Sequence, residues 1–217
     1  MKMKRWSEQA WNAAESVYQA IIRHPFVCQL ASGTLPMENF CFYLAQDALY
    51  IDNYAKVLSH IASRLDNKEH VADFIRFAQD GVYVEKAMHD VFLKGFKVGH
   101  VGKSPACLLY TSLLSAQATA PIEVETAAIL PCFWIYQKVG RAILQQSADN
   151  NPFKLWIDTY SDEAFEASTL RAIEICDELA CNAGTETVKK MTEMFVLCTK
   201  LEWMFWDSAW TLEKWKI

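Results

Sequence analysis

Apolar residues recur along this chain at intervals of three and four, which is the spacing of an amphipathic helix. Near the N-terminus the apolar positions of this pattern are Trp6, Ala10, Ala13, Ala14, Val17 and Ile21. They predict a first helix that ends near His24-Pro25, because the residue before a proline avoids the α-helical backbone conformation.

Further helices are predicted between glycines, prolines and short polar segments. Thr34 followed by Pro36 is typical of a helix start, with the threonine as the cap. Ser161 and Thr185 are also residue types that cap helix N-termini. After the first helix, the pattern predicts helices over about 37–65, 69–95, 106–118 and 121–146, a short helix through 156, and helices over about 162–182 and 185–210.

The composition favours this all-helical interpretation. The 217 residues are 52% hydrophobic and include only 7 glycines and 6 prolines. Such a chain favours long helices over short strands, which need turns roughly every 8–12 residues. No linker, repeat or charge block divides the sequence. We therefore expect one all-α domain over residues 1–217, a bundle of about seven or eight helices.

Charge and hydropathy exclude several classes of partner. A net charge of −5 with scattered Lys and Arg argues against nucleic-acid binding. No run of about 18 apolar residues is present, so we expect no transmembrane helix and no membrane partner. Glu8 and Asn12 interrupt the segment in which a secretory signal would be apolar. A cytoplasmic protein is the expectation.

Asp47 is the first candidate for chemistry because it lies within an aromatic helical face. Its neighbours on that face are Tyr43, Tyr50 and Tyr54. An aspartate among tyrosines is expected to be partly desolvated, and it then needs a partner. A structural alternative is that a tyrosine hydroxyl or a backbone amide supplies that partner.

Cys132 stands out among seven cysteines whose odd number, irregular spacing and lack of a C-x-x-C motif argue against zinc fingers and thioredoxin-like pairs. It follows Pro131, which removes a hydrogen bond inside a predicted helix, and it shares a face with Tyr136. A cysteine in such a setting can act as a nucleophile if its thiolate is stabilised. The alternative, which holds for any cysteine, is a small buried hydrophobe.

Glu202 lies on a strongly apolar helix with only Lys200 and Asp207 as charged neighbours. Desolvation disfavours the charged carboxylate, so its pKa should be raised, which suits a general acid. The structural alternative is an ion pair with a Lys or Arg of another helix.

Two metal-binding interpretations are weaker. A haem-ligating histidine would project from a continuous helix, whereas Pro25 directly follows His24, so a helix-capping role is favoured for this residue. Glu85 and His89 are four residues apart and have no second copy, whereas di-iron bundles use two Glu-x-x-His motifs. Structural roles are expected for these three residues.

Taken together, these motifs resemble the TenA family, also called thiaminase II, over about Trp11 to Trp210. The resemblance implies the haem oxygenase-like all-α fold. It rests on motifs that occur in this order: His24-Pro25-Phe26-Val27, Gly33-Thr34-Leu35-Pro36, Gln46-Asp47, Glu85 and His89, Tyr110-Thr111-Ser112, Leu130-Pro131-Cys132 with Trp134 and Tyr136, Trp156-Ile157, Tyr160-Ser161, and Glu202 with Phe205-Trp206.

The resemblance implies an aminopyrimidine aminohydrolase of thiamin salvage. Such enzymes hydrolyse 4-amino-5-aminomethyl-2-methylpyrimidine to the hydroxymethylpyrimidine and ammonia, and they usually also cleave thiamin to the hydroxymethylpyrimidine and the thiazole alcohol. It further implies a small-molecule substrate, no metal or organic cofactor, and a homotetramer, which the aromatic-rich helices allow.

The resemblance also implies a role for each site residue. Cys132 matches the nucleophile of the cysteine-type subfamily, Asp47 the residue that holds the pyrimidine amino edge, and Glu202 the residue that faces a ring nitrogen. The matching substrate-binding aromatic residues are Tyr50, Tyr110, Tyr136, Tyr160 and Phe205. One departure is visible, since Asp47 is followed by Ala48 where the family often has an aromatic residue.

Three other functions stay open at this point. They are a related enzyme acting on another heterocyclic amine, a haem- or metal-dependent oxidase on the same fold, and a non-enzymatic regulator. The net charge of −5 and the lack of a basic helix-turn-helix disfavour a DNA-binding regulator.

Overall fold

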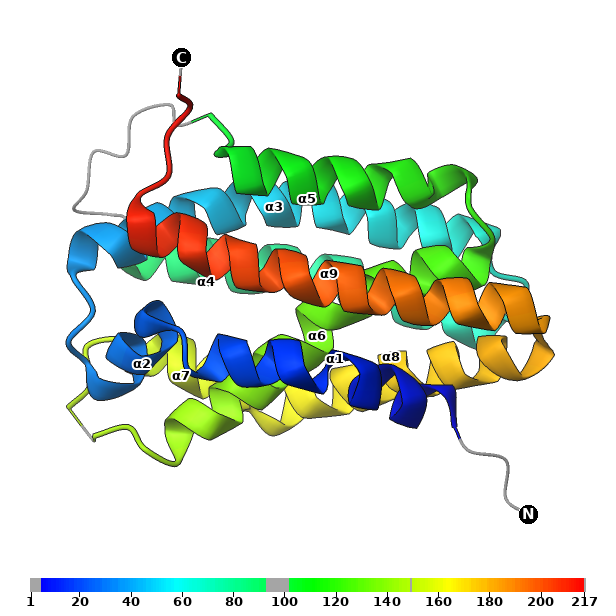
Figure 1. Ribbon diagram of the computed structural model, residues 1–217, viewed down its shortest axis with the longest axis horizontal. Helices are drawn as coiled ribbons and strands as arrows, with labels where there is room; N and C mark the ends of the chain where they lie inside the picture. The colour runs from blue at the N-terminus through cyan, green and yellow to red at the C-terminus, as the bar shows by residue number, and fades with distance from the viewer. Residues whose placement is uncertain (1–4, 93–101, 149, 217) are drawn as a thin grey trace.

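The fold is known from a computed structural model, which describes residues 5–92, 102–148 and 150–216. The regular elements of these residues are all helical (Figure 1). In chain order they are α1 (Trp6–Ile22), α2 (Pro25–Ser32), α3 (Met37–Arg64), α4 (Lys68–Phe92), α5 (Pro105–Ala116), the 3₁₀ helix η1 (Gln117–Thr119), α6 (Ile122–Leu144), α7 (Lys154–Ser161), α8 (Glu163–Asn182) and α9 (Thr185–Thr211). The all-α prediction is confirmed.

Helix α2 is an element that the apolar pattern did not predict. His24 ends the first helical segment as expected, but it also begins the next one, because its Nδ1 accepts a hydrogen bond from the Phe26 amide at 3.2 Å. Pro25 is then the first residue of α2, where the missing N–H costs nothing. Gly33 ends α2 with φ = 72°, a left-handed conformation that favours glycine.

Three predicted caps are wrong in detail. Thr34 makes no cap for α3, since its hydroxyl lies 2.8 Å from that of Ser32. Ser161 is the last residue of α7, and Asp162 caps α8 instead by accepting from the Ala164 amide. Thr185 is the first residue of α9, one position inside the predicted cap. These shifts of one or two residues leave the helices themselves in place.

Helix α6 runs obliquely between two groups of helices (Figure 1). On one side lie α3, α4, α5 and α9, and on the other lie α1, α7 and α8. Helix α6 packs against members of both groups, including α9, α7, α8 and α3. Most of its side chains are therefore buried, and one continuous cluster of buried apolar residues fills the core.

Gly140 allows α7 to lie directly against α6. A Cβ atom at this position would lie 2.6 Å from the carbonyl oxygen of Tyr160, closer than real Cβ contacts. This approach fixes the position of Tyr160, whose ring centroid lies 5.0 Å from that of Tyr136 on α6. Within the described ranges, none of the helices is both long and apolar enough to cross a membrane.

Candidate active site

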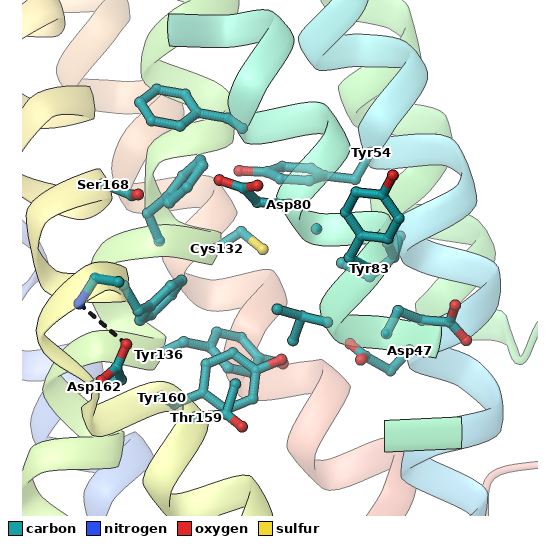
Figure 2. Close-up of a pocket in the computed structure, with 18 of the residues that line it drawn as sticks. Asp47, Tyr54, Asp80, Tyr83, Cys132, Tyr136, Thr159, Tyr160, Asp162 and Ser168 are labelled. Atoms are coloured by element: carbon teal, nitrogen blue, oxygen red, sulfur yellow. Dashed lines mark hydrogen bonds between the residues drawn. The ribbon is translucent and has the colours of Figure 1, made fainter. Parts of the chain in front are cut away.

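A cavity of about 620 Å³ opens between α3, α4, α6 and the α7–α8 connection (Figure 2). Its volume lies within the range of small-molecule sites, roughly 300–1,000 Å³. The lining residues are Asp47, Ile51 and Tyr54 of α3, Phe77, Asp80, Gly81, Tyr83, Val84 and Glu85 of α4, Cys132, Phe133 and Tyr136 of α6, and Asp158, Thr159, Tyr160, Asp162, Ala164, Phe165 and Ser168 of the α7–α8 segment.

Cys132 points its sulfur into the centre of this cavity (Figure 2). Tyr54 lies on one side of the thiol and Tyr136 on the other, so the predicted shared face of Cys132 and Tyr136 does line one space. Burial raises the pKa of the Cys132 thiol well above its ordinary value, and the charge of Glu202 raises it further. The Tyr50 and Tyr54 hydroxyls act in the opposite direction by stabilising the thiolate.

Tyr50 is one of these two stabilising groups, and its hydroxyl is an unusual buried atom. It makes no hydrogen bond of ordinary geometry with any described residue, whereas the Tyr54 hydroxyl donates to the Ile129 carbonyl at 2.8 Å. A buried hydroxyl without a partner costs free energy. The Tyr50 O–H is therefore available to donate to a Cys132 thiolate once that anion forms.

Asp47 is buried at the cavity wall, with 7% of its surface exposed. It makes no hydrogen bond or ion pair with the part of the chain that the structure describes, so the tyrosine or amide cap that would give it a structural role is not found there. Burial raises the pKa of Asp47 to about 7, and the charge of Glu85 adds to this effect. Asp47 thus has unused hydrogen-bonding capacity directed at the cavity.

Glu202 of α9 is 2% exposed and accepts a hydrogen bond from the Tyr110 hydroxyl, 2.7 Å from its Oε1. No Lys or Arg among the described residues pairs with it, which removes the structural alternative there. Burial raises the pKa of Glu202 to about 8, the Tyr110 hydrogen bond lowers it, and the charge of Asp47 raises it. The predicted rise in the Glu202 pKa is confirmed.

The predicted site residues fall into two sets. Asp47, Cys132, Tyr136 and Tyr160 line the cavity. The other four, which lie outside the lining in a buried layer beside it, are Tyr50, Tyr110, Glu202 and Phe205.

Ring contacts join this layer to the cavity wall. The Tyr50 ring centroid lies 5.0 Å from that of Tyr110, 5.8 Å from that of Phe205 and 5.4 Å from that of the wall residue Tyr54. The two sets are therefore in contact, and the charge of Glu202 acts on Cys132 across this layer.

Helix α4 supplies a wall of the cavity that the residue pattern did not predict. Asp80 and Tyr83 carry no sequence signal of function, because polar residues on an amphipathic helix ordinarily face solvent. Glu85 belongs to a motif of the family resemblance and was expected to have a structural role, but the structure places it at the cavity wall. The His89 side chain lies outside the described residues. Within those residues, no group of three or more His, Cys, Asp or Glu is arranged to hold a metal ion.

His24 has the capping role that the sequence favoured. Its Nδ1 caps α2, and its Nε2 lies 3.3 Å from Asp207 Oδ1. Burial lowers the pKa of His24, whereas Asp207 raises it.

The helical bundle thus gathers the half-buried Cys132 thiol, the buried Asp47 carboxyl group and several aromatic rings around one cavity, an arrangement typical of small-molecule sites. The sequence profile of the TENA/THI-4/PQQC family matches residues 11–212. The chain belongs to this family.

Relatives and solved structures agree with this membership. An aminopyrimidine aminohydrolase of Bacillus subtilis is 31% identical, over 97% of this chain and 92% of that protein. A multifunctional thiamine biosynthesis protein, ThiED of Corynebacterium efficiens, is 32% identical over 94% of this chain, which spans only 28% of that longer protein.

Among solved structures, a TenA homologue from P. horikoshii OT3 has a TM-score of 0.84 at 27% identity, covering 96% of this chain and 99% of that one. A domain from Shewanella denitrificans described as having a heme oxygenase-like fold has a TM-score of 0.71 at 15% identity, covering 98% of this chain and 94% of that one. The second likeness shows the fold, as the sequence resemblance implied.

Proposed function

We propose that this protein is an aminopyrimidine aminohydrolase of thiamin salvage that uses Cys132 as a covalent nucleophile. Its substrate would be 4-amino-5-aminomethyl-2-methylpyrimidine, with thiamin as a second substrate. The observation that carries the proposal is the meeting of the Cys132 thiol and the unpartnered Asp47 carboxyl in one aromatic cavity. The aminopyrimidine aminohydrolase of B. subtilis, similar over nearly the full length of both chains, supports it.

Asp47 and Glu202 make the pyrimidine ring an electron sink in this proposal. Asp47 accepts a hydrogen bond from the 4-amino group, which gives the buried carboxylate its missing partner. In this proposal the bound ring reaches from the cavity into the buried layer beside it, where Glu202 donates a proton to a ring nitrogen. A pKa of about 8 keeps that proton available at neutral pH. Tyr110 occupies Oε1 of Glu202, so Oε2 is the oxygen assigned to the ring.

Cys132 then carries the substitution in two steps. Its thiolate adds to a ring carbon, the exocyclic C–N bond breaks with its electron pair going to nitrogen, and the ammonium group departs as ammonia. Water adds to the exocyclic methylene, its proton passes to a carboxylate, and the ring expels the thiolate. Flat tyrosines hold the flat ring at low cost in conformational entropy. No metal or organic cofactor enters these steps.

Two further features belong to the proposal. All seven cysteines are free thiols, which supports a reducing compartment such as the cytoplasm.

A homotetramer is proposed from the sequence resemblance, and large exposed apolar residues on α5, including Leu108 and Leu109, are compatible with subunit contacts. Analytical ultracentrifugation of the purified protein tests the tetramer, and a monomer at micromolar concentration contradicts it.

The decisive experiment incubates the purified protein with each pyrimidine substrate and identifies the products by mass spectrometry alongside an ammonia assay. We expect the hydroxymethylpyrimidine from both substrates. Metal analysis and an absorption spectrum of the same preparation test the oxidase alternative. If neither substrate is consumed while another aminomethyl heterocycle is, the protein acts on a different heterocyclic amine.

Cys132→Ser tests the covalent mechanism. The variant should fold normally and lose activity by on the order of 10³-fold or more, since an alcohol is a far weaker nucleophile at neutral pH. The exposed Cys181 is the matched control, and Cys181→Ser should change turnover little. Near-wild-type turnover by Cys132→Ser contradicts the mechanism.

A further inference from the structure

The wall that α4 contributes to the cavity is acidic and carries an aromatic ring (Figure 2). Within the described residues, the cavity lining contains five carboxyl groups and no Lys, Arg or His side chain. The five carboxyl groups belong to Asp47, Asp80, Glu85, Asp158 and Asp162. The field inside this cavity therefore favours a positively charged ligand.

Three of these carboxyl groups, those of Glu85, Asp158 and Asp162, already take part in an interaction within the chain. Asp158 forms an ion pair with Lys154 at 2.8 Å, and Asp162 caps α8 by accepting from the Ala164 amide at 3.1 Å. Asp80, by contrast, makes no hydrogen bond or ion pair with any described residue. Its carboxylate is free to contact a ligand from the α4 side of the cavity.

Asp47 independently indicates that this cavity can bind a ligand. Only 7% of its surface is exposed, so the residue is 93% buried. Its carboxyl group is directed into the same cavity and has no partner among the described residues. Leaving such a group unpaired is costly, so the cavity is built for a molecule that donates hydrogen bonds or carries positive charge. The described carboxyl groups do not converge as metal ligands, which favours an organic cation.

We propose that Asp80, together with Tyr83 and Glu85, forms a subsite for the cationic leaving half of the substrate. The proposal rests on the function proposed above, because both of its substrates are cationic there, one as a primary ammonium and the other as a thiazolium. The carboxylates attract this charge, and the Tyr83 ring can take it on its face. Gln79 Nε2 lies 3.4 Å from the Tyr83 hydroxyl, and 62% of the Tyr83 surface is exposed.

The chemistry gives this subsite a specific kinetic signature. When the C–N bond breaks, its electron pair goes to nitrogen, so the ammonium leaves as ammonia and the thiazolium as a neutral thiazole. The attraction of Asp80 is therefore strongest in the bound substrate and fades toward the transition state and product. Asp80 should lower KM without raising kcat, and it should not retain the product.

Asp80→Asn tests the subsite, with Asp90→Asn as the matched control on the same helix. Asp90 is exposed and does not line the cavity. In Asp80→Asn, KM for both substrates should rise roughly 2- to 5-fold, as expected for one exposed charge interaction, with the loss falling on KM and not on kcat. High salt should reduce the difference in KM between Asp80→Asn and wild type. Tyr83→Leu should raise KM about two- to fivefold through loss of the ring face.

The neutral hydroxymethylpyrimidine is the probe that separates charge recognition from general damage. It lacks the cationic half, so its inhibition constant should be the same in wild type and Asp80→Asn. Equal weakening of the neutral product and of the cationic substrates overturns the subsite. The subsite is also overturned if Asp90→Asn raises KM as much as Asp80→Asn does, or if Asp80→Asn leaves KM unchanged.

Binding without turnover distinguishes failure of the subsite from failure of the proposed function. In a Cys132→Ser background, calorimetry measures the dissociation constants of thiamin and of the hydroxymethylpyrimidine. Asp80→Asn should weaken thiamin binding alone. If the wild type turns over neither substrate, the proposed function fails, and thiamin binding still decides the subsite. The subsite is overturned if thiamin does not bind, or if Asp80→Asn leaves thiamin binding unchanged.

Discussion

The proposed reaction needs Glu202 protonated and Cys132 deprotonated, and the charge of Glu202 couples the two groups. The charge of Glu202 raises the pKa of the Cys132 thiol, so a protonated Glu202 makes the thiolate easier to form. Conversely, the Glu202 pKa of about 8 means that the acid is present below pH 8 and is lost above it. The proposed reaction needs this combination of a neutral carboxylic acid and a thiolate anion.

Replacement of Glu202 by Gln should change the pH profile as well as the rate. In wild type, activity rises with pH as the thiolate forms and falls as Glu202 loses its proton, so the profile of kcat/KM against pH is bell-shaped. The two limbs belong to the coupled pair. Glu202→Gln has no titrating proton, so kcat should fall by roughly 10²-fold or more and the alkaline limb should change.

Tyr110→Phe is the companion variant for this experiment. The Tyr110 hydrogen bond lowers the pKa of Glu202, so its removal should move the alkaline limb to higher pH. A Glu202→Gln enzyme with wild-type kcat and an unaltered profile would leave Glu202 without an acid role.

Asp47→Asn tests whether Asp47 recognises the 4-amino group of the substrate. The change keeps the shape of the side chain and removes an anionic acceptor. A hydrogen bond to a charged group contributes about 1.5–3 kcal/mol, which corresponds to a decrease of roughly 10- to 150-fold in kcat/KM. Steady-state kinetics with the aminomethyl substrate measures this decrease. An unchanged kcat/KM would mean that Asp47 has only a structural role.

At the scale of helices, α6 determines where the nucleophile lies. It continues through Pro131 and places Cys132 and Tyr136 on one face, directed at the cavity. The contact at Gly140 brings α7 close enough for Tyr160 to complete the wall opposite α4. The geometry of the site therefore depends on a helix contact that only glycine permits.

Gly140→Ala should disrupt this contact. Because the new Cβ would meet backbone atoms of Tyr160, α7 must shift, and overpacking of this kind costs typically about 1–3 kcal/mol. Urea denaturation measures this loss, and kcat/KM should fall as well because Tyr160 moves. Gly81→Ala is the control, since no atom lies within 4 Å of its Cβ, and alanine there should be neutral or stabilise α4 by up to about 1 kcal/mol. Equal unfolding midpoints for both variants would contradict the close contact.

At the scale of the whole molecule, the buried carboxyl groups make stability depend on pH. Asp47 and Glu202 have raised pKa values in the folded state, so the folded protein holds protons that the unfolded chain releases. Stability is then fully present below the ordinary carboxyl pKa and is lost as pH rises toward about 7 and 8. Burial of these two carboxyl groups in the site therefore lowers the stability of the folded protein at alkaline pH.

Thermal unfolding at pH 5.5 and pH 8.5 checks this expectation. Wild type should be less stable at the higher pH, by an amount on the order of a few kcal/mol for groups shifted this far. Asp47→Asn and Glu202→Gln should each reduce the difference between the two pH values. If both variants keep the wild-type difference, other groups control the pH dependence. The control is Asp90→Asn, whose side chain is exposed and should leave the difference unchanged.

The sequence by itself determined the features that depend on local spacing. The 3.6-residue period predicted the helices and placed Cys132 beside Tyr136 and Asp47 among tyrosines, because residues three or four apart must share a face. It also predicted the raised pKa of Glu202, since an apolar helix desolvates any carboxyl group on it. The organisation of residues 1–217 as a single domain stays a prediction.

Only the tertiary structure decided which helix faces meet. Asp80 and Tyr83 are exposed residues of α4, and their spacing in the sequence does not show that they line the cavity together with residues of α3, α6 and α7. Likewise, spacing along the chain could not separate Tyr160, which lines the cavity, from Tyr110, which supports Glu202 behind its wall. The physical reason is that the helical period sets directions within one helix, whereas contacts between helices depend on packing, such as the approach that Gly140 allows.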